Sequence, residues 1–419
     1  MANPTPQYFY QFLGAHSLLI GLLPFFLPVY LWTHGLGLAG LSLLIGVSGM
    51  SFALSLCLWQ RWSYRWPLRR LVALSFILEI ALVFVVGLFT AVPGMPLFDF
   101  PANPAPSSNT NLALAAIGIG FFNGLYNGFF WTTQRTLFLS QLGLNDTGKQ
   151  YGNFQIFVTL FLKAGILLGG FLLELGGFIW LLALSAGISA VSNLWLADSD
   201  NGNKPLQLSN RDSVGNRQSL TYTDQRGSRQ TFAIDGIFLY LESHFWTLSL
   251  FLLVKQDFTR LGFAVVALAL GFAVLFFLIK NRIDKVAVEH VYRAAVLLYA
   301  VSWLLRFTLT EDSPVSEQPG AEDTALLLTL LVITFFSTFF RLVFNKRFFD
   351  VARNEGAVRY LLLKSYSSQW LLGIFFASSG ALLFIIDTQT HHVLQVLYLL
   401  AAVLSLVYLG YRDKPQTPG

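Results

Sequence analysis

Charged residues are scarce in this chain, and apolar residues are in excess. Asp, Glu, Lys and Arg together make up 12% of the 419 residues, whereas hydrophobic residues make up 55%. An ordinary soluble domain carries about 25% charged residues, and a disordered chain has much less apolar content. The composition therefore excludes both classes and indicates a protein that lives in a lipid bilayer.

Cysteine and the motifs of common enzymes are nearly absent as well. Cys57 is the single cysteine, so the chain cannot form an intramolecular disulfide. No P-loop, Rossmann fingerprint or G-x-S-x-G elbow stands in a credible structural setting, which excludes ATP-driven transport unless another subunit supplies the ATPase. His391 and His392 have no neighbouring Cys or acid, so we expect neither a metal site nor a cofactor.

Apolar stretches of about 20 residues, the length of a membrane-spanning helix, recur along the chain. We identify twelve: Tyr8–Trp32, Leu36–Trp59, Leu71–Val92, Leu112–Thr136, Phe154–Leu175, Gly177–Ala197, Ile234–Val254, Thr259–Ile279, Val291–Leu309, Thr324–Phe344, Tyr360–Ile386 and His391–Tyr411. The predicted fold class is an all-α polytopic membrane protein, with twelve transmembrane helices in two pseudo-symmetric six-helix halves.

One polar segment, Asp198 to Ala233, separates the sixth stretch from the seventh. It is rich in Ser, Asn, Gln, Arg and Asp and poor in residues that could form a core. This composition predicts a flexible cytoplasmic linker. The linker divides the chain into an N-terminal half, residues 1–197, and a C-terminal half, residues 234–419, which we expect to be structural repeats.

Basic residues gather in alternate loops, and Lys and Arg are retained on the cytoplasmic side of membrane proteins. Clusters follow the second, eighth and tenth spans, at 61–70, 280–285 and 346–359, while the loop at 311–323 is acidic. Both termini are therefore predicted to be cytoplasmic. The first apolar stretch lacks a basic flank and a cleavage site, so it is the first span and not a signal peptide. We expect a bacterial inner membrane.

The expected partners follow from the same charge pattern. The basic residues are spread over membrane loops and do not gather on one soluble face, so nucleic acid is not an expected partner. We expect a small-molecule solute, a proton or another coupling ion, and the surrounding membrane lipid.

In its six-plus-six spans, central cytoplasmic linker and inward termini, the chain resembles the major facilitator superfamily over essentially its whole length. The loop signature of that family, G-x-x-x-D-(R/K)-x-G-(R/K)-(R/K), is degenerate here. Between spans two and three it retains Arg69-Arg70, and between spans eight and nine it retains Asp284-Lys285 without the glycines. The resemblance implies that spans one, four, seven and ten line a central cavity and that the protein is a monomer.

The fourth span carries the most informative polar residues, which are costly in hydrocarbon and usually face a cavity or a partner. Asn123, Asn127 and Trp131 recur every four residues and so share one helical face. Two amides and an indole are suited to binding a polar or amphipathic solute. The alternative is helix packing, because Asn and Gly are common between membrane helices. Glycines stand on a neighbouring face at Gly120, Gly124 and Gly128.

Basic residues inside the spans point to an anion. Lys163 lies near the middle of the fifth span, where an ammonium group needs a carboxylate, backbone carbonyls or an anionic solute. A structural ion pair with Glu79 is the equal alternative to a solute anion. Arg341 in the tenth span is a further candidate for anion binding, whereas Arg306 is expected to snorkel to lipid headgroups. An anionic or zwitterionic organic solute fits these residues.

The seventh span carries Tyr240 and His244 on one face and Glu242 on another. We expect Tyr240 to contact the solute. A carboxylate or imidazole in a partly dry cavity can exchange a proton with its surroundings, and Glu242 is the leading candidate for proton coupling, with His16, His244 and Glu79 as others. The alternative for Glu242 is an acid that is solvated from the cytoplasm.

Together these features predict a secondary active transporter that works by alternating access and has no enzymatic activity. Two other classes stay open. A receptor or assembly factor built on a carrier fold predicts binding without flux. A membrane-embedded enzyme acting on lipid predicts a changed product, and the lack of a clustered His, Asp and Glu constellation argues against it.

Overall fold

The computed structural model describes residues 6–90, 108–141, 147–197, 224, 226–283, 288–309, 321–386 and 389–412. The regular elements of these residues are helices. Those of the predicted N-terminal half are α1 (Pro6–Thr33), α2 (Gly37–Ser63), α3 (Leu68–Thr90), α4 (Ser108–Gln141), α5 (Thr147–Leu175) and α6 (Phe178–Ala197). Those of the C-terminal half are α8 (Ser228–Tyr240), η3 (Leu241–Phe245), α9 (Trp246–Leu253), α10 (Phe258–Ile283), α11 (Val288–Leu309), α12 (Ala321–Glu355), α13 (Ala357–Ile385), α14 (Thr390–Ser405) and η4 (Leu406–Gly410).

The helices follow the predicted spans in order. Within the described residues, 11 stretches are long and apolar enough to cross a membrane by length and composition. One of them combines α8, η3 and α9 as Ser228–Leu253. The remaining predicted span is α10, a helix of 26 residues whose described apolar part is the shorter Phe258–Gly271. The predicted all-α polytopic fold class is confirmed.

Helix boundaries differ from the apolar boundaries where a helix continues into polar sequence. α4 and α12 run to 34 and 35 residues, past both ends of the apolar stretches inside them. α8 begins at Ser228, ahead of Ile234, because the Asp224 carboxylate accepts hydrogen bonds from the backbone N–H groups of Arg226 and Ser228 (3.3 and 3.2 Å). Most of the predicted linker, residues 198–223 and 225, lies outside the described residues.

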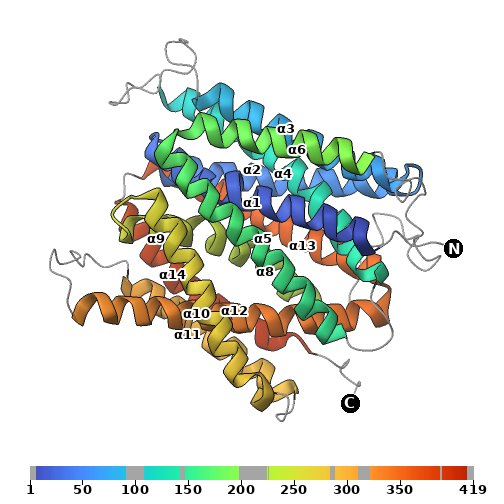
Figure 1. Cartoon of the computed structure of the whole chain (residues 1–419). Helices are drawn as coiled ribbons and strands as arrows, with labels where there is room; N and C mark the ends of the chain where they lie inside the picture. Colours follow the sequence, from blue (N-terminus) through green and yellow to red (C-terminus); the bar gives the residue numbers. More distant parts are fainter. Residues whose placement is uncertain are drawn as a thin grey trace.

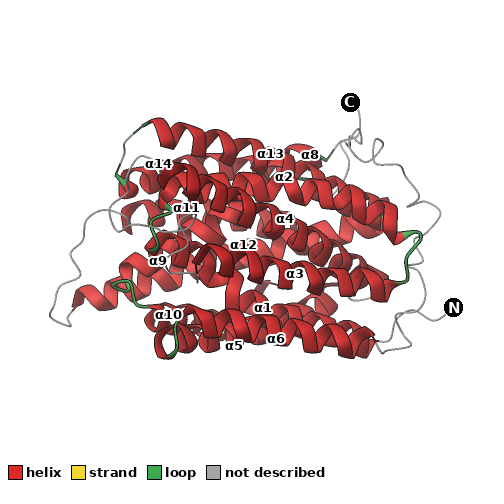
Figure 2. Ribbon diagram, turned by 90° about the horizontal axis from the view of Figure 1, so that it is seen from above, coloured by secondary structure: helices red, strands yellow, loops and turns green. Residues whose placement is uncertain are grey.

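The helices form one bundle in which α3 and α6 lie at one side and α10 and α11 at the other (Figure 1). Their axes run roughly side by side, as Figure 2 shows from above. The two predicted halves meet where α2 packs against α13. Gly46 of α2 lies against the backbone of Ala377, and farther along the pair the Tyr366 hydroxyl donates to the Cys57 sulfur (3.2 Å). This contact runs along much of both helices.

A second contact between the halves joins α5 and α10. The Thr259 hydroxyl donates to the backbone carbonyl of Gly170 (3.2 Å), and Gly262 lies against the carbonyl of Ile166. Glycine at these positions lets the helix backbones approach closely, which is how helices associate in lipid. The polar residues described below lie between these two contacts and inside each half.

Candidate functional site

A chain of hydrogen bonds follows one face of α4 and crosses to the second half. The Trp131 indole donates to the Asn127 side-chain carbonyl (3.0 Å), and the Asn127 amide donates to the backbone and side-chain oxygens of Asn123 (2.8 and 2.9 Å). The Asn123 amide donates to the Ser48 hydroxyl on α2 (3.0 Å), which lies 3.3 Å from the Tyr240 hydroxyl on α8. We call these five residues the amide ladder. It brings together four residues that the sequence singled out.

Close packing of α4 on α2 builds the ladder. A side chain at Gly124 would collide with the backbone and hydroxyl groups of Ser48 and Ser51, and one at Gly128 would collide with Ser55. The glycine stripe therefore brings α4 close enough for the Asn123 amide to reach α2. Asn123 is buried and links two helices, as the packing alternative expects, whereas Asn127 and Trp131 are half-buried, and their contact with a solute stays a prediction.

Flat rings flank the ladder at both ends. The Tyr240 ring stacks on the His244 imidazole, with centroids 4.9 Å apart and an angle of 27° between the planes. At the other end the Arg135 guanidinium lies 5.5 Å from the Trp131 ring centroid. The ladder thus offers amide, hydroxyl and aromatic groups within one line of contacts. These are groups that bind polar solutes with ring systems.

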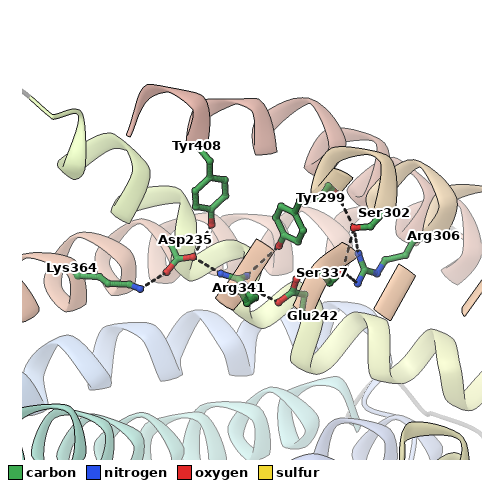
Figure 3. Close-up of polar contacts among 9 residues, drawn as sticks. All are labelled: Asp235, Glu242, Tyr299, Ser302, Arg306, Ser337, Arg341, Lys364 and Tyr408. Carbon is green, nitrogen blue, oxygen red and sulfur yellow. Dashed lines mark hydrogen bonds and ion pairs between the residues drawn. The ribbon is translucent and has the colours of Figure 1, made fainter. Parts of the chain in front are cut away.

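A second set of polar residues, the charge cluster, lies inside the C-terminal half (Figure 3). Asp235 on α8 pairs with Arg341 on α12 (2.5 Å) and with Lys364 on α13 (3.1 Å), and it accepts a hydrogen bond from the Tyr408 hydroxyl (2.7 Å). Arg341 also donates to Glu242 (2.9 Å). The two acids and two bases therefore have no net charge together, and such pairing offsets the desolvation free energy of burying charged groups.

Burial varies across the charge cluster. The side chains of Asp235 and Lys364 are 1% and 6% exposed, whereas those of Arg341 and Glu242 are 15% and 19% exposed. The predicted anion contact, Arg341, and the leading proton candidate, Glu242, are thus paired with each other.

Sequence reasoning missed Asp235 and Lys364. Asp235 stands at the very start of the predicted seventh span, where an acid is expected to be solvated. Lys364 had a usable signal, because it lies inside the predicted eleventh span and an intramembrane ammonium group requires a partner. The partner itself lies more than one hundred residues away in the chain and needs the folded structure to find it.

A π-helical turn sets the direction of the side chains in the seventh span. η3, Leu241–Phe245, separates α8 from α9 and contains both Glu242 and His244. A π turn holds one extra residue and so changes the helical register, and such turns are frequent at functional sites. Here Tyr240 belongs to the amide ladder and stacks on His244, whereas Glu242 pairs with Arg341. The sequence gives no signal for this turn.

Arg306 does not reach the lipid headgroups, so the expectation that it snorkels is wrong. Its side chain is buried, with 2% of the residue exposed, and it donates to the hydroxyls of Ser302 (3.0 Å) and Ser337 (2.8 Å). Its guanidinium lies 4.2 Å from the Trp303 ring centroid and 4.8 Å from that of Trp246. Hydroxyls and indole faces inside the bundle satisfy the charge in place of water.

The N-terminal half holds a third polar set, which we call the histidine cluster. His16 on α1 lies 3.0 Å from the Ser75 hydroxyl through Nε2, and through Nδ1 it lies 3.4 Å from the Tyr126 hydroxyl and 3.6 Å from Glu79. All four side chains are buried. Lys163 is half-buried and forms no ion pair with Glu79 or with any other residue that the structure describes.

Comparison with known proteins shows the fold. No protein-family model matches the chain, and no curated protein matches it. Among solved structures, a mutant of the nucleoside transporter NupG superposes with a TM-score of 0.63 at 15% identity, covering 96% of this chain and 97% of that one. Nucleoside transporter NupG itself gives 0.62 at 15% identity and covers 96% of both chains. The chain therefore shares the fold of these two transporter structures over almost its whole length.

Proposed function

We propose that the protein is a secondary active transporter that moves a polar organic solute by alternating access and couples this movement to a proton or another ion. The observation that carries the proposal is the amide ladder, which joins α4 and α2 of one half to α8 of the other. Solute bound at such a place contacts both halves, as alternating access requires. The fold shared with a nucleoside transporter supports the same conclusion.

The ladder suits a solute with a ring and several hydrogen-bonding groups, and a nucleoside is the first such solute to test. In the described structure the polar groups of the amide ladder form hydrogen bonds with one another. A solute that enters replaces one of these bonds with a bond to itself, so no buried polar atom is left without a partner. The ring would stack on Trp131 or on the Tyr240–His244 pair. The 3.3 Å contact between Ser48 and Tyr240 is long for two hydroxyls and is the easiest one to exchange.

An anionic group on the solute has two places to bind. Lys163 has no carboxylate partner among the described residues, and the Arg341–Glu242 pair is partly exposed. In the proposed mechanism the two halves, residues 1–197 and 234–419, rock about this region. The carrier works as a monomer in a bacterial inner membrane, with both of its termini in the cytoplasm.

A thermal-shift screen tests the binding step, because a ligand that binds the folded state raises its apparent stability. Purified protein is screened against uridine, adenosine, nucleotides and amino acids, with Asn127→Ala as the ladder variant. Trp180→Ala is the matched surface control, since Trp180 is 60% exposed on α6. We expect a hit whose thermal shift Asn127→Ala weakens and Trp180→Ala retains.

Uptake of the same solute into proteoliposomes then separates the three classes. A transporter accumulates unchanged solute inside the vesicle. Binding without uptake would favour the receptor alternative, and a chemically altered product would favour the enzyme. Hits that persist in every ladder variant would refute the site assignment while leaving the fold unaffected.

A further inference from the structure

Glu79 is a carboxyl group buried without a hydrogen bond. The residue is 1% exposed, and neither of its side-chain oxygens has a hydrogen-bond partner. An ionised carboxylate in an apolar interior is strongly unfavourable unless donors or a cation compensate it. In the charge cluster the Asp235 carboxylate is compensated by two cations, Arg341 and Lys364, and by the Tyr408 hydroxyl. Glu79 has nothing comparable.

The groups around Glu79 come from three helices. On α1, His16 is the one ionisable side chain paired with it among the described residues, at 3.6 Å. On α4, the Tyr126 hydroxyl lies 3.4 Å from the same Nδ1 atom of His16, and on α6, Ser189 lies beside the carboxyl group outside hydrogen-bond geometry. Ser75 lies on α3, the helix that carries Glu79, and forms a hydrogen bond with His16. No Lys or Arg of the described chain pairs with Glu79.

Aromatic rings enclose the imidazole of His16. Its centroid lies 4.1 Å from that of Phe76 and 4.2 Å from that of Phe130, and Phe12 packs edge-on at 4.8 Å. The ring is therefore fixed in place, with Nδ1 directed toward Glu79 and Tyr126. A net change of charge inside this apolar enclosure is costly, so the pair can gain or lose a proton only when a conformational change admits water.

We propose that Glu79 and His16 form the proton-binding site of the carrier, and that in this structure the site is occluded, with the proton on the Glu79 carboxyl group. This inference rests on the proposed transport function and names its coupling site. When the N-terminal half opens to water, the proton passes from the carboxyl oxygen to solvent by way of the nearby imidazole. While the proton is on the imidazole, the imidazolium stabilises the vacated carboxylate, and once the proton has left for solvent, the admitted water stabilises it.

α4 connects this site to the solute site. Tyr126 on α4 contacts His16, and Asn123 and Asn127 on a neighbouring face of the same helix belong to the amide ladder. A shift of α4 that admits water to Glu79 therefore also moves the ladder. The proton and the solute need no direct contact for their binding to be linked.

Infrared difference spectroscopy of the purified protein in lipid tests the proton site without any solute. We expect the carbonyl stretch of a protonated carboxylic acid at neutral pH, lost in Glu79→Gln and retained in both Glu242→Gln and Glu174→Gln. Gln has the shape of the protonated acid, so Glu79→Gln should keep the wild-type thermal unfolding temperature. A protonated band that survives in Glu79→Gln, or the absence of any such band in the wild type, would overturn the proposal.

Transport under an ion gradient gives the second readout, with labelled uridine as the probe. An inward proton gradient should concentrate uridine in wild-type vesicles and in Glu174→Gln, whose exposed acid lies at the end of α5. Glu79→Gln should keep uridine exchange between the two sides but lose concentration above equilibrium. Concentration that follows a sodium gradient and depends on Glu79 would overturn the proton assignment.

The two proposals fail in different ways. If no solute in the panel is transported, the proposed function fails while the Glu79 infrared band can still be present. If uridine is concentrated by Glu79→Gln as well as by the wild type, the transport function stands and the proton site is refuted.

Discussion

The N-terminal and C-terminal parts of the chain each bury a polar cluster, but the two clusters balance charge differently. In the C-terminal half, Asp235 and Glu242 are matched by Arg341 and Lys364, and the four side chains contact one another directly. In the N-terminal half, Glu79 faces one imidazole across 3.6 Å and has no hydrogen bond. A balanced cluster resists a change of protonation, whereas an unbalanced one invites it. The proposed proton site is therefore placed at Glu79 and not at the balanced charge cluster.

The largest expected effect is on stability, from Asp235→Ala. Removing this acid leaves Lys364 buried without its acid partner and leaves Arg341 with Glu242 alone, and breaking a buried ion pair from one side costs about 3–5 kcal/mol. Thermal unfolding in detergent should show a large fall, or the protein should fail to accumulate. The double variant Asp235→Asn with Lys364→Met should recover part of the loss. An Asp235→Ala protein as stable as Glu79→Gln would contradict the comparison.

The next effect is on uptake, from Asn127→Ala. This change removes the acceptor of the Trp131 indole and the link to Asn123. A bound solute also loses its hydrogen bonds to the Asn127 amide, and bonds worth about 1–3 kcal/mol correspond to a fall in solute affinity of roughly 5- to 150-fold. The fall should appear in the concentration dependence of uptake into vesicles. Trp180→Ala should match the wild type, and an equal loss there would point to general damage.

A third effect tests how the ladder is assembled. Gly124→Ala places a methyl group against Ser48 and Ser51, and overpacking of this kind costs about 1–3 kcal/mol. We expect a lower unfolding temperature together with weaker solute binding, because α4 must move away from α2. Gly187→Ala on α6 is the matched control, since no atom lies within 4 Å of the added carbon. Equal behaviour of the two variants would refute the close-packing explanation.

The smallest stability effect is expected for Lys163→Gln. Because this lysine forms no ion pair with a described residue, its removal should change the free energy of unfolding by no more than about 0.5 kcal/mol, as for substitutions that break no specific contact. Binding of nucleotides and other anionic solutes should weaken, and binding of neutral nucleosides should not. Parallel titrations of adenosine and adenosine monophosphate provide the measurement. A stability loss as large as that of Asp235→Ala would show that Lys163 is structurally paired.

The fold and part of the site could be predicted because their signals are local. Apolar stretches identify the spans one by one, and the spacing of Asn123, Asn127 and Trp131 defines a helical face within nine residues of sequence. The amide ladder is largely a consequence of that spacing. Its link to the second half through Ser48 was not visible, since serine is common in membrane helices and carries no distinctive pattern.

The charge cluster could not be predicted because its signals are distant. Asp235 and Arg341 are separated by 106 residues, and each has several plausible partners until the helices are packed. The same is true of Arg306, whose hydroxyl and indole partners come from three helices. Periodicity predicts which residues share a face of one helix, but it does not predict which faces of two helices meet.

The most direct test of the account is uptake of labelled nucleosides into proteoliposomes that contain the wild type or Asn127→Ala, with the protein content matched. We expect time-dependent, saturable accumulation of unchanged solute by the wild type at low solute concentration, reduced at least about 5-fold in the variant. Wild-type protein that binds the solute without moving it, or an Asn127→Ala variant that transports it equally well, would contradict the account.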